Sequence, residues 1–156
     1  MADDITVKII NSKRLGRRFA VFYRKLDNRT LIYKKAVILI HGWIQRNFKE
    51  DGGLAHPGKG WKSLRPETIW ARQKGWGYYK PATIDPQILR HKGFLKSKWR
   101  QTYNRRHGKV ESSVDYGLAH HEGKGNLPKR RILPTENQGD KLIKPLFGDW
   151  IRTSLK

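Results

Sequence analysis

The longest hydrophobic pattern in the chain has helical spacing and predicts a helix at about 29–50. Its apolar positions recur at steps of three and four residues, at Tyr33, Val37, Ile40, Ile44 and Phe48. Asp27 or Asn28 can cap this helix, because either side chain accepts a hydrogen bond from a free N–H of the first turn. The run at 36–40 is apolar nearly all round, so we expect the helix to lie in the middle of the domain or to pack on a second subunit.

Alternation of apolar and polar residues predicts strands elsewhere. A first strand is expected at about 4–10, and a half-buried strand with a basic outer face at about 94–106. Leu95, Trp99 and Tyr103 form the apolar face of the second strand. Gly108 turns the chain into a segment at 108–114, which pairs back as a hairpin.

Three further segments are marked by prolines and glycines. Pro128 and Pro134 bracket a basic segment, so we expect an extended edge strand at about 127–133. Asn137-Gln-Gly-Asp140 breaks the chain, and the apolar residues that follow predict a C-terminal helix at about 145–155, which either starts near Pro145 or has a kink there. The segment at 17–26 fits either a strand or a helix.

A glycine-rich loop is predicted at 51–60. Gly53, Gly58 and Lys59 have part of the spacing of a phosphate-binding loop, but Gly60 stands where that loop requires Ser or Thr. No apolar strand precedes it either, so we reject nucleotide binding there. The length of 156 residues favours one domain, at 1–156.

The charge of the chain points to a polyanion or an acidic protein as partner. Thirty-four Lys and Arg stand against 13 Asp and Glu, which gives a formal net charge of +21. Eight of these cations and no acid lie between 90 and 109. The candidate contact face on that segment comprises Lys96, Lys98, Arg100, Arg105 and Arg106. Contact of this face with DNA phosphates makes a basic nucleic-acid-binding protein the alternative function.

The sequence favours no catalytic, metal or cofactor site. Cys is absent, which excludes disulfides and thiolate metal ligands. The adjacent His120 and His121 diverge on a helix or a strand, so one ion is hard to bind with both, and a metal-dependent nuclease is the least favoured alternative. No apolar run reaches the roughly 18 residues of a membrane helix. The acidic N-terminus lacks a signal-peptide core, so we expect the protein in the cytosol unless it leaves within a particle.

Four motifs in a fixed order carry a resemblance to a known family. They are Trp61-x-x-Leu64-x-Pro66-x-Thr68, Ile88-Leu89 with Gly93-Phe-Leu95, Tyr116-Gly-Leu-Ala-His-His-Glu-Gly123, and Leu127-Pro-Lys-Arg-Arg131. In this order, over about residues 27–155, the chain resembles the phage virion morphogenesis family, the tail-completion or neck proteins of tailed bacteriophages. It departs from the family pattern at Gly117, where alanine is usual.

The resemblance implies an α+β fold, with an antiparallel sheet packed against a long N-terminal helix, plus a C-terminal helix. It also implies a structural protein of the virion, made in the host bacterial cytoplasm, with no enzyme activity and no cofactor. We expect a homo-oligomeric, hexameric ring at the head–tail junction or tail end, in contact with other neck and tail proteins, and genomic DNA is a further candidate partner. The candidate assembly residues are Trp61, Leu64, Tyr116, His120, Gly123, Pro128 and Arg130.

Overall fold

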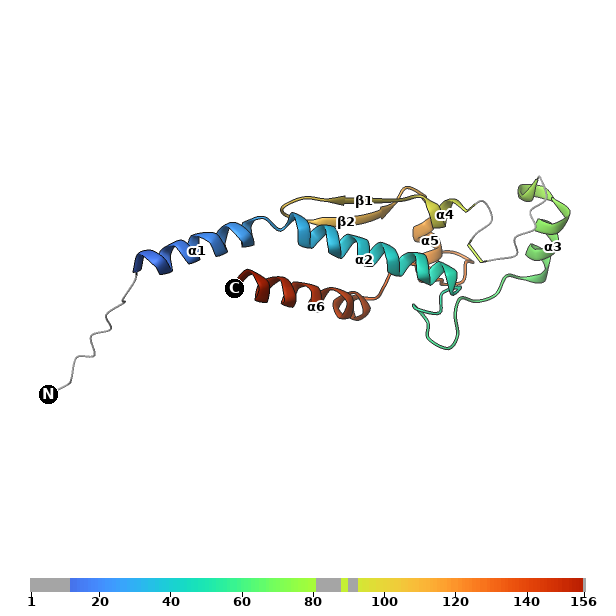
Figure 1. Cartoon of the computed structure of the whole chain (residues 1–156). Helices are drawn as coiled ribbons and strands as arrows, with labels where there is room; N and C mark the ends of the chain where they lie inside the picture. Colours follow the sequence, from blue (N-terminus) through green and yellow to red (C-terminus); the bar gives the residue numbers. More distant parts are fainter. Residues whose placement is uncertain (1–11, 81–87, 90–92, 156) are drawn as a thin grey trace.

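A computed structural model describes residues 12–80, 88–89 and 93–155 (Figure 1). The strand predicted at 4–10 lies outside these residues. The elements, in chain order, are α1 (Ser12–Asp27), α2 (Thr30–Lys49), α3 (Pro66–Lys74), the 3-10 helix η1 (Gly77–Tyr79), α4 (Phe94–Ser97), β1 (Trp99–Tyr103), β2 (Gly108–Ser112), α5 (Tyr116–Glu122) and α6 (Glu136–Leu155).

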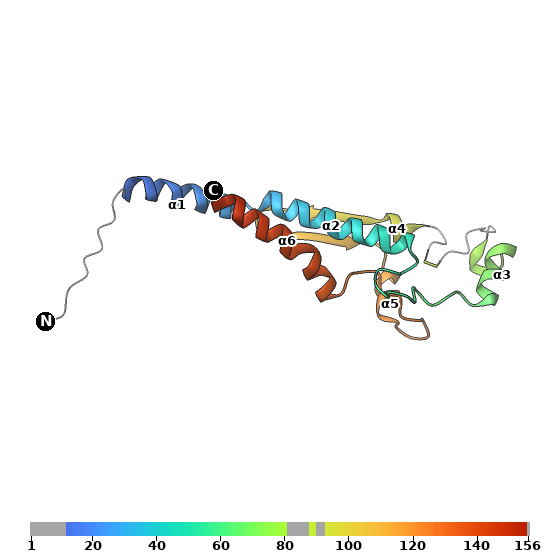
Figure 2. The ribbon, with the colours of Figure 1, turned by 60° about the horizontal axis from the view of Figure 1, so that its bottom comes forward.

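The molecule is elongated along the direction of α1 and α2 (Figures 1 and 2). Helix α1 continues in line with α2 at one end, and α3 lies at the other end. The segment at 17–26, which fitted strand or helix, belongs to α1. This arrangement places the start of the described chain far from α3.

Helix α2 is the central element, and the predicted long helix is confirmed. One side packs on both strands of the hairpin and another side packs on α6. Its apolar stripe is buried or, at Tyr33 and Ile40, half-buried, whereas Leu31, Ile38 and Leu39 are exposed. The predicted cap is wrong, because Arg29 is the capping residue and makes no side-chain hydrogen bond, while the carboxylate of Asp27 pairs with Arg105.

Strands β1 and β2 form an antiparallel hairpin, with Trp99 opposite Ser112 and Tyr103 opposite Gly108. The hairpin lies directly on α2: a Cβ added at Gly108 would come within 2.7 Å of Val37 Cγ2. The α+β class, with an antiparallel sheet against the long helix, is therefore confirmed.

The first strand is shorter than the predicted 94–106 for two local reasons. Gly93 adopts a positive φ of 69°, and the residues after it form the helical turn α4 instead of extended chain. At the other end, the side-chain oxygen of Asn104 accepts hydrogen bonds from the backbone N–H groups of Arg106 and His107, which favours a turn over a longer ladder.

Helix α6 begins at Glu136, nine residues before the predicted start at Pro145. Thr135 and Gln138 form a capping box: the Gln138 N–H donates to Thr135 Oγ1, and the Thr135 N–H donates to Gln138 Oε1. This reciprocal pair starts the helix in spite of Gly139, and the helix continues through Pro145. The predicted break at 137–140 is wrong.

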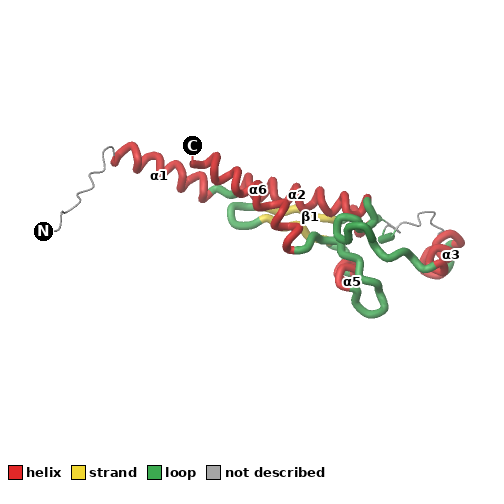
Figure 3. Tube along the Cα trace, turned by 90° about the horizontal axis from the view of Figure 1, so that it is seen from below, coloured by secondary structure: helices red, strands yellow, loops and turns green. Residues whose placement is uncertain are grey.

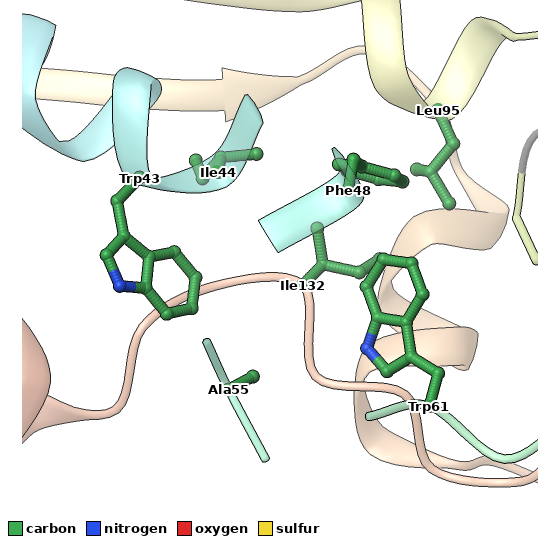
Figure 4. Close-up of a cluster of buried hydrophobic side chains, with 7 residues drawn as sticks. All are labelled: Trp43, Ile44, Phe48, Ala55, Trp61, Leu95 and Ile132. Carbon is green, nitrogen blue, oxygen red and sulfur yellow. The ribbon is translucent and has the colours of Figure 1, made fainter. Parts of the chain in front are cut away.

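The main core lies where the C-terminal half of α2 meets three segments distant in sequence (Figure 4). The buried side chains come from α2, the loop after it, α4 and the segment before α6: Trp43, Ile44, Phe48, Ala55, Trp61, Leu95 and Ile132. Phe48 and Trp61 meet edge to face, with ring centroids 5.3 Å apart. This core anchors the irregular segments that form the candidate site.

Candidate functional site

A pocket of about 810 Å³ opens beside the core, between α3, η1, α5 and the segment at 125–130. Tube and ribbon views show that α5 and the loop after it project from the body on the side where α3 lies (Figure 3). The lining side chains used below are Lys62, Leu64, Arg65, Arg72, Tyr78, Tyr79, Phe94, Tyr116, His120, Pro128 and Arg130. They include residues from all four motifs of the family resemblance. Others come from the aromatic segment at 75–80, which lies between the first two motifs in the sequence.

Helix α5 presents two rings to the pocket. Tyr116 and His120 stand one turn apart on the same face, and their ring centroids are 6.0 Å apart. Gly117 fits α5 against the core, since a Cβ there would come within 2.9 Å of Leu95 Cδ1. This close approach favours glycine at position 117. Gly123 ends the helix at a φ of 74°, and a Cβ there would meet the backbone of Lys129 at 3.0 Å.

Arg130 joins two of the motifs physically. Its side chain is buried, and Nε and Nη2 both donate to the carbonyl oxygen of Lys62, at 3.3 and 3.1 Å. Its backbone N–H donates to the carbonyl oxygen of His120 at 2.8 Å. One residue therefore fixes the spacing between α5 and the segment after Trp61.

The predicted strand at 127–133 is wrong, because this segment has no strand partner among the described residues. Side chains hold it instead. The buried Asn47 amide donates to the carbonyl oxygens of Arg131 and Ile132, and Trp61 Nε1 also donates to that of Arg131, at 2.9 Å. On the other edge, His121 Nδ1 accepts from the N–H of Ile132 at 3.0 Å. These contacts replace the ladder that a strand would need.

Aromatic rings form much of the wall of the pocket and remain partly open. Tyr78, Phe94 and Tyr116 are 71%, 44% and 46% exposed. Arg72 lies over the Tyr79 ring, 5.4 Å from its centroid. Burial, and then the neighbouring Tyr78, raise the pKa of the Tyr116 phenol, so this group stays neutral at physiological pH.

The ionisable lining groups that the structure describes are cations, tyrosine phenols and one histidine, with no carboxylate among them. Lys62 and Arg65 are exposed at the pocket, whereas Arg72 and Arg130 are buried in its wall. Burial, and then the nearby Arg130, lower the pKa of His120, which favours its neutral form. Its Nδ1 is buried and has no hydrogen-bond partner among the described residues. The pocket therefore combines positive charge with open aromatic surface.

Most of the candidate assembly residues converge here. Leu64, Tyr116, His120, Pro128 and Arg130 line the pocket. Trp61 lies behind it in the core, and Gly123 shapes the turn that leads to it. Sequence reasoning missed the contributions of Arg65, Arg72 and Tyr78. The aromatic segment at 75–80 was the available signal, but its place in the fold depends on contacts that spacing does not reveal.

The predicted basic face is divided by the structure. Arg105 pairs with Asp27, and Lys98 lies over the Phe94 ring, 4.5 Å from its centroid. Arg100 lies exposed on the hairpin, directly opposite Glu111, and the pKa of Glu111 is lowered by its hydrogen bond with Lys109. Lys96 and Arg106 complete the set, Lys96 on α4 and Arg106 at the hairpin turn. This face does not meet the pocket as one continuous site.

Within residues 12–80, 88–89 and 93–155, no three His, Asp or Glu side chains are grouped so that they could hold a metal ion. Over the same residues, no helix has the length and apolar character needed to cross a bilayer. Comparisons with protein-family models, curated proteins and solved structures gave no match to this chain.

Proposed function

We propose that this chain is a non-enzymatic structural protein of a bacteriophage virion, a tail-completion or neck subunit that forms a ring at the head–tail junction or tail end. One observation carries the proposal. The motif segments on which the family resemblance rests meet in space around one pocket and the core beside it. Segments that share only an accidental pattern have no reason to converge on a single surface feature.

The distribution of exposed apolar side chains also supports assembly. At the α3 end, Trp70 and Trp76 meet edge to face and are both more than half exposed. At the other end, a groove of about 540 Å³ is lined by Val21, Leu31 and Trp150, among others. A closed ring uses two different patches, one meeting the other on the next subunit. The two ends of this elongated molecule offer such a pair.

Nucleic-acid binding remains the second candidate, because of the net charge of +21 and the exposed cations of the hairpin. Two of the cations in this region, Arg105 and Lys109, already form ion pairs with carboxylates. Phosphate contacts release counterions, so affinity for DNA would fall steeply with salt. The affinity of an interface built on aromatic burial would depend much less on salt.

Replacing Tyr116 with Ala tests the assembly proposal at the pocket. The ring is 46% exposed, so its loss should leave the fold intact while it removes aromatic surface from the interface. Native mass spectrometry should then show a shift from ring to monomer. Tyr103→Ala, at an exposed ring on the hairpin, is the matched control and should assemble as the wild type does. Normal rings from Tyr116→Ala would refute a role for the pocket in assembly.

A further inference from the structure

The lining of the pocket combines exposed positive charge with open aromatic surface, which is complementary to carboxylates beside apolar side chains. Lys62 and Arg65 offer exposed positive charge, and the rings of Tyr78, Phe94 and Tyr116 offer apolar surface a short way from it. A carboxylate at the rim and an aliphatic side chain against the rings would satisfy both features. The arginine side chain is suited to carboxylate recognition because it can donate two parallel hydrogen bonds.

Half of the ten described carboxylates form ion pairs within the chain. Five are paired with a Lys or Arg of the same molecule, at Asp27, Glu111, Glu122, Asp140 and Asp149. The sequence contains one pair of adjacent carboxylates that precedes the first described helix, Asp3-Asp4. Ile5, Val7 and Ile9 follow at alternate positions, so the segment carries both chemical features that the pocket requires.

This segment cannot reach the pocket of its own molecule. Helices α1 and α2 have 16 and 20 residues, so at 1.5 Å per residue they span about 24 and 30 Å. They lie end to end (Figures 1 and 2), and the pocket is lined by α3, η1 and α5, which lie at the end of α2 farther from α1. The 11 residues before α1 cover at most about 40 Å when fully extended, which is less than the roughly 54 Å along the two helices. The same segment of a neighbouring copy is not restricted by this distance.

We propose that the acidic segment at 1–11 of one subunit docks in the basic, aromatic pocket of the next subunit. Asp3 and Asp4 meet Lys62 and Arg65, and the aliphatic residue after them, Ile5, packs against Tyr78 and Tyr116. The contact joins opposite ends of two elongated molecules, so it is heterologous and propagates around a ring. This inference rests on the proposed ring assembly and names the partner of the pocket.

A binding measurement tests the contact without requiring a ring. The probe is a fluorescent peptide of residues 1–10, capped at both ends, added to the full chain carrying Asp3→Asn and Asp4→Asn so that its own segment does not compete. Fluorescence anisotropy should show saturable binding at 150 mM salt. Lys62→Glu with Arg65→Glu should weaken binding at least tenfold, and Tyr116→Ala several-fold. Arg100→Glu with Arg106→Glu, on the hairpin, is the matched control for charge and should stay within twofold.

A charge exchange tests the same contact in assembly. Asp3→Lys with Asp4→Lys should reduce oligomer formation, as should Lys62→Glu with Arg65→Glu, and combining all four substitutions should restore it. If the wild type forms rings and Asp3→Lys with Asp4→Lys forms them equally well, the inference fails while the proposed function stands. If the peptide binds at the pocket but no oligomer forms under any condition, the ring proposal fails instead.

Two outcomes of the binding experiment would overturn the inference. Equal loss of binding in the hairpin control would show that the peptide responds only to the net charge of the protein. Displacement of the peptide by oligo(dT), with tighter binding that depends on Tyr78 and Tyr116, would make the pocket a site for single-stranded nucleic acid, since bases stack on aromatic rings beside cations.

Discussion

The body of the molecule and its pocket end are held together in different ways. In the body, which comprises α1, α2, α6 and the hairpin, helices and strands pack through apolar side chains. At the pocket end, irregular segments are held by side chains that form hydrogen bonds with the backbone. In the body, Tyr33 of α2 meets Phe147 of α6 edge to face, with centroids 6.0 Å apart. At the pocket end, Asn47, Trp61 and Arg130 donate to carbonyl oxygens of segments 68 to 85 residues away. Apolar packing tolerates exchange of similar side chains, but these hydrogen bonds each require one particular group.

The comparison explains which parts of the structure could be predicted. The stripe of α2 is a local pattern, so the sequence alone predicts it. The extended segment at 127–133 looked like a strand because its prolines favour extended chain, but its partners are side chains of Asn47, Trp61 and His121, and no local rule reveals them. The Thr135–Gln138 capping box marks the start of α6 in the sequence, but Asn137 and Gly139, which favour turns, follow within the same turn and predict a break instead.

The candidate site was predicted in part. The ordered motifs identified Tyr116, His120 and Arg130, which share the pocket. Arg65 and Tyr78 were missed, because they lie on either side of α3 in the sequence and reach the pocket through the path of the chain around that helix. That path depends on ring contacts, such as the Trp70–Trp76 pair, rather than on periodicity.

The largest expected effect is in the core that supports both regions. Ile44 of α2 is fully buried, so Ile44→Ala should lower the free energy of unfolding by about 3 kcal/mol, the usual cost of a cavity of this size. Chemical denaturation followed by Trp fluorescence measures the change. Leu39→Ala, on the exposed side of the same helix, should cost less than about 1 kcal/mol. Equal losses for the two variants would mean that the exposed side of α2 is buried in solution.

Removal of one hydrogen-bonding side chain should destabilise the pocket end and leave the stability of the body unchanged. Asn47→Ala removes the partner of the Ile132 carbonyl and of the Ala55 N–H, while the Arg131 carbonyl keeps its hydrogen bond from Trp61, so the cost should be about 2 kcal/mol. Hydrogen exchange should accelerate at the Ala55 amide, while the amides that join β1 and β2 keep their protection. Asn137→Ala, at an exposed position on α6, is the matched control. Equally faster hydrogen exchange in the pocket end and in the body would contradict the claim that the two regions are stabilised separately.

Acid should loosen the pocket end before the body. The pKa of His121 is lowered by burial first and then by Arg131, so the unfolded chain takes up this proton at a higher pH than the folded one. Stability is then constant above the unfolded value of roughly 6.5 and falls as the pH drops below it, until the folded group also protonates. His120 acts in the same direction, since its pKa is also lowered.

Thermal melts and hydrogen exchange between pH 7 and pH 5 measure this response. Protonation of His121 Nδ1 removes the acceptor of the Ile132 N–H, so the protection factor of that amide, which corrects for the slower intrinsic exchange in acid, should be lower at pH 5. His121→Gln should flatten the dependence of the melting temperature on pH. His107→Gln, at an exposed histidine on the hairpin turn, should leave it unchanged. Equal protection of the Ile132 amide at both pH values would refute the claim that protonation of His121 breaks this hydrogen bond.

The smallest expected loss of stability is at the start of α6, in the body of the molecule. Thr135→Ala removes the capping oxygen of α6 and should cost about 1 kcal/mol. Hydrogen exchange at the first turn of α6 should accelerate without change at α5. Thr153→Ala, near the other end of the same helix, controls for loss of a threonine. Faster exchange at α5 in Thr135→Ala would show that the two regions are coupled through α6.

Native mass spectrometry with negative-stain imaging, on nuclease-treated wild-type protein at low and high salt, tests most directly the claim that the chain assembles into a ring. The account predicts a closed ring that survives high salt, because aromatic burial contributes to the contact as well as charge. A monomer at all protein concentrations that binds DNA strongly at low salt and releases it at high salt would contradict the account and favour a nucleic-acid-binding protein.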